Sequence, residues 1–195
     1  MPPVDLIAAM VEREAEIAVG PSTARGQGSP GVVQALRSAL ARVPLSKFSV
    51  ADESTFLREL EQTTKFVKSQ LPRKAASWGI ARKCVNIFLR DCFYNRYICD
   101  HFGLLSAESL FEVPLDSFAA KGLKAHGRGE LPRWPGVKNL VPAVSSQYQC
   151  AALELSRSWG ISRVHLDTFL FVEGRKLTPN RAVNRTRLKR RAGYR

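Results

Sequence analysis

Apolar residues spaced three and four positions apart dominate this chain, and that spacing restricts it to helical folds. The strongest run covers residues 74–102, where it predicts one long helix with Gly103 as a stop signal. Alternation of period two is scarce, and no hairpin-turn signature separates strand-like runs. The sequence therefore predicts an all-α fold. The apolar positions of the long run include Val85, Phe88, Leu89, Cys92, Phe93, Tyr97 and Ile98.

Further helices are expected on both sides of this run. Asp52, Glu53 and Ser54 supply capping groups and early negative charge ahead of an apolar run, and Pro72 ends that helix. Shorter helices are predicted over residues 32–43, 107–111, 145–159 and 163–172, and another begins near Asp116.

Composition divides the chain into three parts. Residues 1–31 are predicted to be a flexible N-terminal segment, in which a short helix leads to the Gly/Ser/Pro-rich linker 20–31. Residues 32–174 form the predicted helical domain, and the 45% of hydrophobic residues in the chain is ample for its core. Residues 175–195 form a tail with nine Lys and Arg and no acidic residue.

The formal net charge is +13, and removing the nine cations of the tail leaves +4 for residues 1–174. A basic tail of this kind is either simply solvated or bound to phosphates, where each cation adds salt-dependent affinity for any sequence. A membrane-binding tail would need an accompanying apolar face, which is missing. Nucleic acid is therefore the favoured partner.

Nothing in the chain predicts a membrane span, a disulfide or a metal site. No stretch approaches the roughly 18 apolar residues of a span, and the acidic first sixteen residues do not resemble a signal peptide. We therefore expect a cytoplasmic, DNA-associated protein without a cofactor. Cys84, Cys92 and Cys99 have helical spacing that favours burial, and no C-x-x-C pair is present. His165 and Asp167 lie two apart, which puts them on different helix faces.

Residues 78–86 (Trp-Gly-Ile-Ala-Arg-Lys-Cys-Val-Asn) form the first informative segment. A glycine-containing turn that leads into a helix can present backbone N–H groups, and the helix N-terminus adds partial positive charge. Such a unit can hold a phosphate. An ordinary helix corner with two exposed cations, Arg82 and Lys83, is the alternative.

Residues 112–121 (Glu-Val-Pro-Leu-Asp-Ser-Phe-Ala-Ala-Lys) form the second informative segment. Pro114 and Asp116 indicate a helix start with Asp116 as the N-cap. Capping holds a carboxylate in one position, and a catalytic carboxylate has the same requirement.

Together, the two segments resemble the helix–hairpin–helix DNA glycosylase superfamily, to which endonuclease III belongs. In that family a hairpin of the form L-P-G-V-G-R-K-T-A-N precedes a helix, and a later V-D-T-H segment supplies the catalytic aspartate. The resemblance covers roughly residues 56–172. Within the superfamily, the chain most resembles the alpha-glutamyl/putrescinyl thymine pyrophosphorylase-like group, which includes antiphage glycosylases. The matching positions are Gly79, Arg82, Lys83 and Asn86 in the hairpin, and Asp116 and Ser117 in the later segment.

The chain also departs from the family pattern. Ala81 replaces the second glycine of the hairpin, Ser77 and Trp78 replace its Leu-Pro lead, and Phe118 replaces the histidine. The four-cysteine cluster of endonuclease III is absent. These departures affect the expected substrate and strand-cleaving lyase step more than the expected fold.

The resemblance implies a monomeric enzyme that flips a modified base out of double-stranded DNA and cleaves its N-glycosidic bond. Glucosylated hydroxymethylcytosine of phage DNA is one such base. Asp116 would stabilise positive charge on the sugar, and Lys83 would be the amine nucleophile of a lyase step. If Lys83 instead contacts phosphate, the enzyme would leave an abasic site. A base-hypermodification enzyme and a non-catalytic DNA-binding module are the alternatives.

Several other residues are candidates for contacts with DNA or with the flipped base. For the tryptophans among them, packing in the core or anchoring of a loop is the alternative. Arg90 and Tyr94 lie on the Lys83 side of the predicted helix, and the loop 127–142 interleaves cations with an aromatic residue. The candidates for DNA contact are Trp78, Gly79, Arg82, Asn86, Arg128, Arg133, Lys138, Lys189, Arg190 and Arg191, and those for the pocket are Arg90, Tyr94, Ser117 and Trp134.

Overall fold

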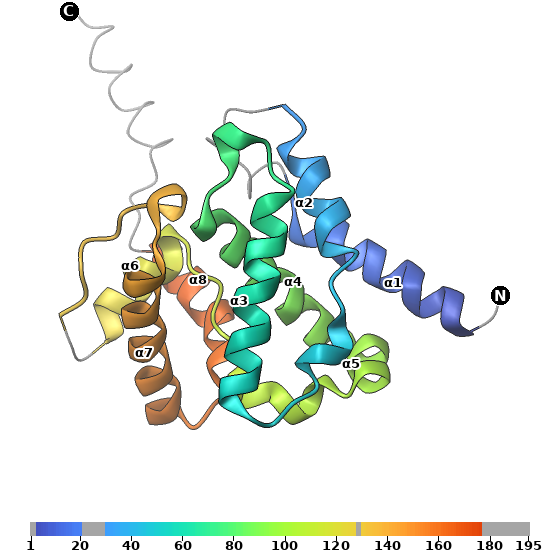
Figure 1. The fold of residues 1–195 in the computed structure, drawn as a ribbon. Helices are drawn as coiled ribbons and strands as arrows, with labels where there is room; N and C mark the ends of the chain where they lie inside the picture. Colours follow the sequence, from blue (N-terminus) through green and yellow to red (C-terminus); the bar gives the residue numbers. More distant parts are fainter. Residues whose placement is uncertain (1–2, 21–29, 128–129, 177–195) are drawn as a thin grey trace, which may run out of the picture.

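A computed structural model describes residues 3–20, 30–127 and 130–176 of the chain. These residues form helices and no β-strand, which confirms the predicted all-α class (Figure 1). None of the helices described is long and apolar enough to cross a membrane. The α-helices are α1 (Pro3–Ala18), α2 (Val32–Leu40), α3 (Glu53–Ser69), α4 (Trp78–Tyr94), α5 (Arg96–Phe102), α6 (Ser117–His126), α7 (Pro142–Trp159) and α8 (Leu166–Lys176).

Short 3₁₀ helices lie in the connections between these elements. They are η1 (Leu45–Phe48), η2 (Arg73–Ala75), η3 (Leu104–Leu110), η4 (Val137–Asn139) and η5 (Arg163–His165). The expected helix at residues 107–111 is thus the end of a 3₁₀ segment. The expected helix at 163–172 begins as 3₁₀ and continues as α8.

The long helix predicted over residues 74–102 is two helices, which corrects that prediction. Asn95 has an extended backbone that ends α4, and its side chain caps α5 by accepting the N–H of Ile98 at 3.3 Å. Asn95 also donates its side-chain N–H to Glu14 of α1 at 2.9 Å. The apolar spacing does not reveal the break, because α5 continues to bury a face through Ile98 and Cys99.

The larger hydrophobic cluster contains residues from each of the helices α1, α2, α3, α4 and α5 and from η1 and η3. Helix α4 runs through its middle. Eleven residues of α4 are buried, more than an amphipathic surface helix would bury. Aromatic rings fill the space beneath α3: Phe56 packs edge-on against Phe48 and Phe111, with ring centroids 5.5 and 5.3 Å apart. The buried cysteines Cys84, Cys92 and Cys99 belong to this cluster, as their spacing predicted.

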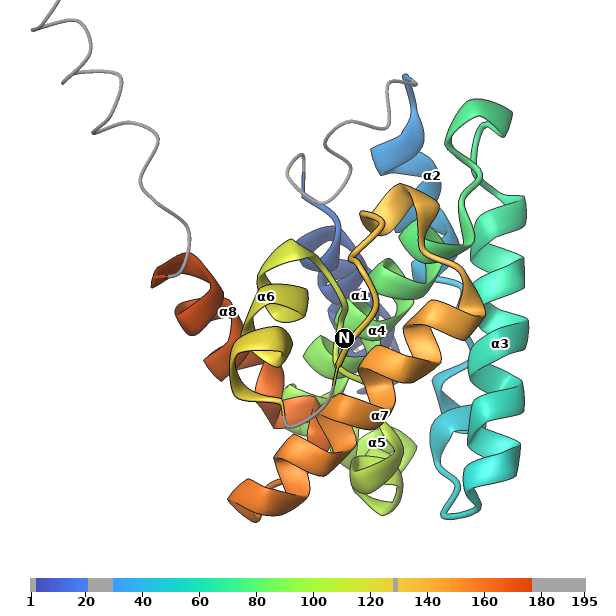
Figure 2. The same ribbon diagram turned by 90° about the vertical axis from the view of Figure 1, so that its left-hand side faces the viewer.

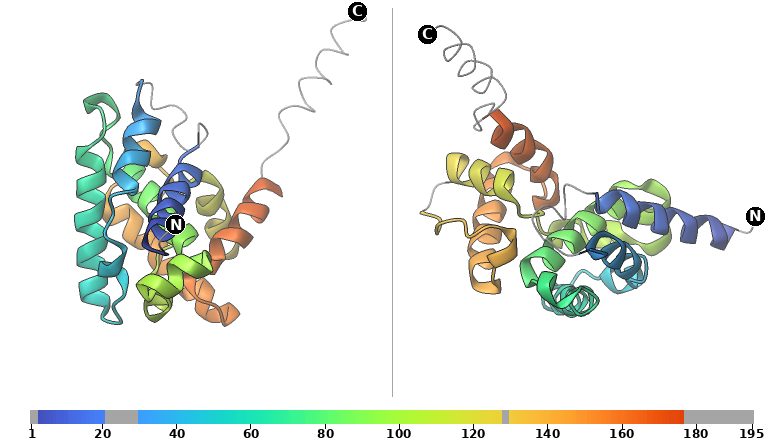
Figure 3. Two further views of the ribbon diagram at one scale, coloured as in Figure 1. Left: turned by 90° about the vertical axis from the view of Figure 1, so that its right-hand side faces the viewer. Right: turned by 90° about the horizontal axis from the view of Figure 1, so that it is seen from above.

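Helix α1 is also part of this cluster, which corrects the prediction that residues 1–31 form a flexible segment. Val11, Ala15 and Ala18 are buried, and α1 packs against α2, α4 and α5 (Figure 3). Three of the buried residues of α1 and the residue that follows it are small (Ala15, Ala18) or β-branched (Val11, Val19), and the acidic residues between them mask this apolar face in the sequence. The centre of the predicted linker, 21–29, lies outside the described residues.

A smaller cluster is formed by α6, α7 and α8, which Figure 2 shows grouped away from α3. At Gly122 of α6 an added Cβ would lie 2.8 Å from a methyl group of Leu170 on α8, so glycine lets these two helices pack closely. Viewed from above, α4, which belongs to the larger cluster, lies between this group and α1 (Figure 3, right). Helix α8 continues to Lys176, two residues past the domain boundary predicted at 174.

Candidate active site

Lys83 and Asp116 come together where the two clusters meet. The Nζ atom of Lys83, on α4, lies 3.5 Å from Oδ2 of Asp116, which directly precedes α6. Both side chains are partly buried, with 13% and 29% of their surface exposed. An amine and a carboxylate at the junction of two packed units can carry out nucleophilic and acid–base chemistry, and ligand sites favour such junctions.

The two carboxylate oxygens of Asp116 have different partners. Oδ1 accepts the backbone N–H groups of Phe118 at 2.8 Å and Ala119 at 3.0 Å, which confirms Asp116 as the N-cap of α6. Oδ2 faces Lys83. The cap therefore orients the carboxylate and leaves one oxygen available to the site.

Arg82 and Asn86 lie inside the protein, which corrects the expectation that their side chains contact DNA. Nε and Nη2 of Arg82 donate to the two carboxylate oxygens of Glu112 at 2.9 and 3.1 Å. Asn86 donates to the same carboxylate at 2.9 Å. Arg82, Asn86 and Glu112 are all buried, and a buried carboxylate is stable only when it is paired and hydrogen-bonded.

Glu112 keeps its charge in spite of its burial. Burial alone would raise the pKa of Glu112, but the neighbouring Arg82 guanidinium, with smaller contributions from Arg163 and Asn86, holds that pKa below its ordinary value. Sequence reasoning missed this residue as a partner of Arg82. Its one sequence signal is a single charge within the apolar run of residues 110–115.

Trp78 and Gly79 form the first turn of α4, where a phosphate-binding hairpin turn was expected. A Cβ on Gly79 would lie 2.2 Å from the carbonyl oxygen of Val137 and 2.6 Å from Cβ of Leu140, so glycine allows η4 to pack on α4. The Trp78 indole N–H donates to Glu61 at 3.1 Å, and its ring lies against the Arg82 guanidinium. Both residues therefore have packing roles in the structure.

The remaining candidates within the described residues are Lys138, Arg133, Ser117 and Trp134. Lys138 is exposed, and its carbonyl accepts the Ser77 hydroxyl at 2.7 Å, which places it beside the beginning of this helix. Arg133 and Ser117 are exposed. Trp134 is partly buried and packs edge-on against Tyr148 at 5.3 Å, in agreement with the loop-anchor interpretation. The candidates outside the described residues are Arg128, Lys189, Arg190 and Arg191.

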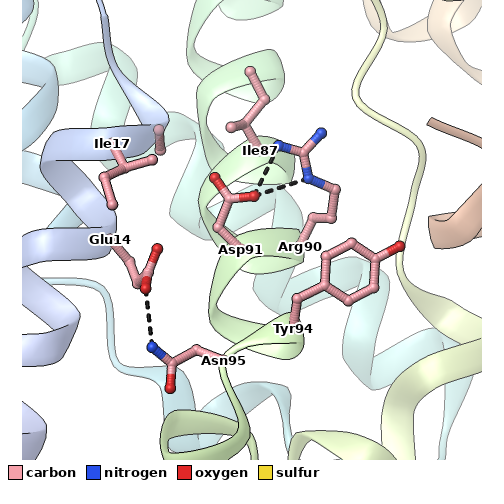
Figure 4. Close-up of a pocket in the computed structure, with 8 residues that line it drawn as sticks. Glu14, Ile17, Ile87, Arg90, Asp91, Tyr94 and Asn95 are labelled. Carbon is pink, nitrogen blue, oxygen red and sulfur yellow. Dashed lines mark hydrogen bonds and ion pairs between the residues drawn. The ribbon is translucent and has the colours of Figure 1, made fainter. Parts of the chain in front are cut away.

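Arg90 and Tyr94 line a cleft of about 530 Å³ between α1 and the second half of α4. Figure 4 shows Arg90 bound to Asp91, with Glu14 of α1 across the cleft. Arg90 also contacts Asp167 at the start of α8. Burial raises the pKa of Asp167, Arg90 opposes that rise, and the charge of Asp116 adds to it. Neither Lys83 nor Asp116 lines this cleft, which corrects the expectation that Arg90 and Tyr94 face the same pocket as Lys83.

A series of polar side chains in contact with one another begins at Tyr94. Its hydroxyl lies 2.9 Å from Nδ1 of His165, whose Nε2 lies 3.0 Å from a carboxylate oxygen of Glu108. No local sequence pattern indicates this arrangement, because its members come from α4, η3 and η5. Within the described ranges, no three His, Cys, Asp or Glu residues are placed to hold a metal ion.

Lys83, Asp116 and their buried neighbours Arg82 and Glu112 form one connected arrangement between α4 and residues 110–116. No protein-family model, no curated protein and no solved structure matches this chain.

Proposed function

We propose that the protein is a DNA N-glycosylase that excises a modified base, with Asp116 and Lys83 at its reaction centre. The observation that carries this proposal is the 3.5 Å separation of the Lys83 amine from a carboxylate oxygen of Asp116. The two residues belong to the two segments that resemble the glycosylase motifs. Their side chains meet although 33 positions separate them in the chain.

The pair has the groups that cleavage of an N-glycosidic bond requires. When this bond breaks, its electron pair leaves with the base and positive charge develops on the sugar. The Asp116 carboxylate stabilises that charge. Water then adds to C1′ and gives a proton to the departed base, which leaves an abasic site. Alternatively, the Lys83 amine forms the new bond to C1′ and gives up a proton to Asp116. The C1′–O4′ bond of the sugar ring then breaks, its electron pair is protonated at O4′, and a Schiff base between Lys83 and C1′ remains.

The charge distribution supports a polyanionic substrate. Exposed Arg73 and Lys74 of η2 precede α4, and Lys138 of η4 is joined to the same place by its hydrogen bond with Ser77. The net charge of +13 favours a partner with phosphates. The reaction centre lies five residues beyond this basic end of α4.

A base-release assay tests the proposal. The protein is incubated with unmodified DNA and with DNA that contains hydroxymethylcytosine or its glucosylated form. Freed bases are identified by mass spectrometry and abasic sites are counted. We expect release from a modified DNA and at least a hundredfold slower release by Asp116→Asn, because loss of one charge-stabilising group costs about 100-fold or more in rate.

The matched control is Asp52→Asn, which makes the same change at the N-cap of α3. Asparagine caps helices as well as aspartate does, so both variants should keep the stability of the native protein. Full activity of Asp116→Asn would contradict the proposed reaction centre. DNA binding without any freed base would exclude a glycosylase, and an altered base mass in an intact strand would indicate base modification.

Borohydride trapping tests the role of Lys83 separately. If the amine attacks C1′, reduction during turnover should give a covalent protein–DNA complex that Lys83→Ala cannot form. Lys47→Ala is the control, because Lys47 also forms a lysine–carboxylate pair, with Glu59 at 3.3 Å. A trapped complex that persists in Lys83→Ala would assign the nucleophile to another amine. Base release without any trapping would assign the attack to water.

A further inference from the structure

The buried polar side chains of the protein are concentrated around one short segment. Nine polar or charged residues are buried among the described residues, and most of them are connected to residues 110–113. An even distribution over two hydrophobic clusters would not produce this concentration. The connected residues are Thr64, Arg82, Asn86, Glu112, Gln149 and Arg163.

Each part of the segment is held by a side chain from a different element. Arg82 of α4 binds the Glu112 carboxylate with two hydrogen bonds and donates to Thr64 of α3 at 3.0 Å. Gln149 of α7 accepts the N–H of Val113 at 3.2 Å and donates to its carbonyl at 2.8 Å. Arg163 of η5 donates to the carbonyls of residues 110 and 111 at 2.9 and 3.1 Å.

The segment leads directly to Asp116. Residues 111–115 are buried and belong to no helix, and Pro114 restricts the backbone on both sides of itself. Arg82 directly precedes Lys83. Two ion pairs therefore join α4 to residues 110–116. Arg82–Glu112 lies in the interior, and Lys83–Asp116 lies at the edge of the site.

Stability alone does not account for the interior pair. Apolar side chains of similar volume often replace a buried ion pair without loss of stability, whereas removal of one partner is strongly destabilising. The polar network supplies a fixed register between α4 and residues 110–116, which interchangeable apolar contacts would specify less strictly. A misplacement of 1 Å at a reaction centre lowers the rate about 100-fold.

We propose that Arg82 and Glu112 are positioning residues, which hold residues 110–116 so that Asp116 stays against the Lys83 amine. Their effect on rate rests on the proposed glycosylase function. Their effect on the geometry of Lys83 does not depend on it. Neither side chain touches the substrate, since both are buried behind the pair.

The test is the double variant Arg82→Met/Glu112→Leu, which replaces both charges by apolar side chains. We expect a folded protein with a somewhat lower melting temperature, because the buried Asn86 loses its acceptor, together with a kcat about 100-fold lower and an unchanged KM. Thr63→Val is the control, because Thr63 is a buried polar residue of α3 outside the network. A double variant with native kcat would overturn the proposal.

A second measurement does not require activity. The ¹⁵N resonance of the Lys83 ammonium reports its environment, and Asp116→Asn defines the signal of an unpaired Lys83. The double variant should reproduce that signal, and Thr63→Val should leave the native one. A folded double variant with the native Lys83 signal would overturn the proposal, even if base release depends on Asp116.

The two proposals can fail separately. If the native protein frees no base but the Lys83 signal moves in the double variant, the glycosylase assignment fails and the positioning role stands. If the double variant does not fold, Gln149→Met loosens the same segment from the α7 side. We expect it to move the Lys83 signal as well, and an unchanged signal would again overturn the proposal.

Discussion

At the scale of single residues, the site depends on carboxylates with more than one partner. Asp116 caps α6 with one oxygen and faces Lys83 with the other. Glu112 binds Arg82 through both oxygens and also accepts a hydrogen bond from Asn86. Such carboxylates have few orientations, because several donors have to be satisfied together. The result is a preorganised pair of charges at the site.

The lowered pKa of Glu112 predicts a part of the acid sensitivity of the fold. Because this pKa is lower in the folded state than the ordinary value of 4.5, the ionised Glu112 stabilises the fold at pH values above 4.5. This stabilisation is lost as the pH falls through the folded-state pKa. In Arg82→Met/Glu112→Leu, the unfolding free energy should therefore depend less steeply on pH in this acidic range.

Urea unfolding at a series of pH values measures this dependence, with Thr63→Val as the control. Identical slopes for the double variant and the native protein would mean that Glu112 has the same proton affinity in both states. Glu108 does not obscure the comparison. Its pKa is lowered chiefly by its hydrogen bond to His165, and it is present in every variant.

At the scale of elements, close helix contacts are made through small residues. Ala15 lies in the buried face of α1, and Gly122 brings α6 against α8. Gly79 does the same for α4 and η4. Such contacts place Lys83 and Asp116 within reach of each other, because they determine how closely α4 and the α6–α8 unit approach their neighbours.

Two identical substitutions in α1 test whether this helix belongs to the core. Ala15→Asp places a carboxylate in the buried face of α1, whereas Ala9→Asp places it on the exposed face of the same helix. We expect the first to lower the unfolding free energy by about 3 kcal/mol or more, because an unpaired buried charge is destabilising by that order. The second should change it by about 0.5 kcal/mol or less.

Chemical denaturation of the full chain measures both values. Equal effects of the two variants would mean that α1 is not packed against α4 in solution. The helical domain would then begin near residue 32, as the sequence alone suggested.

At the scale of the whole molecule, the candidate site and much of the positive charge lie in different parts of the chain. The described clusters build the site where they meet along α4, whereas much of the positive charge lies outside them. Residues 177–195 contain seven Lys and Arg and no acidic residue. These residues lie beyond the described part of the chain, and their composition alone predicts a salt-dependent contribution to DNA binding.

Truncation after Lys176 tests that contribution. Affinity should fall for DNA of any sequence, and the slope of log affinity against log salt should decrease by about 0.9 for each phosphate that the tail neutralises in the full chain. Fluorescence anisotropy at several salt concentrations measures both quantities. The kcat at saturating DNA should not change, because the contacts that hold Lys83 and Asp116 come from described residues that the truncation retains. An unchanged slope would show that the tail neutralises no phosphates.

The sequence by itself determined the features whose causes are local. The sequence predicts Asp116 as an N-cap and capping groups among Asp52, Glu53 and Ser54, because a cap and the N–H groups it accepts lie within three residues. The helical class and the burial of Cys84 follow from spacing along one helix. The pairing of Lys83 with Asp116 was expected only through resemblance to a family with both motifs.

Tertiary structure decided the features that need partners distant in sequence. Arg82 faces inward because Glu112, thirty residues later, is buried beside it. Asn95 is held by Glu14 of α1, and α1 joins the core, through contacts that hydrophobic spacing does not encode. Which partner a charged side chain meets depends on how helices pack. Packing is cooperative over the whole chain, so no local pattern specifies it.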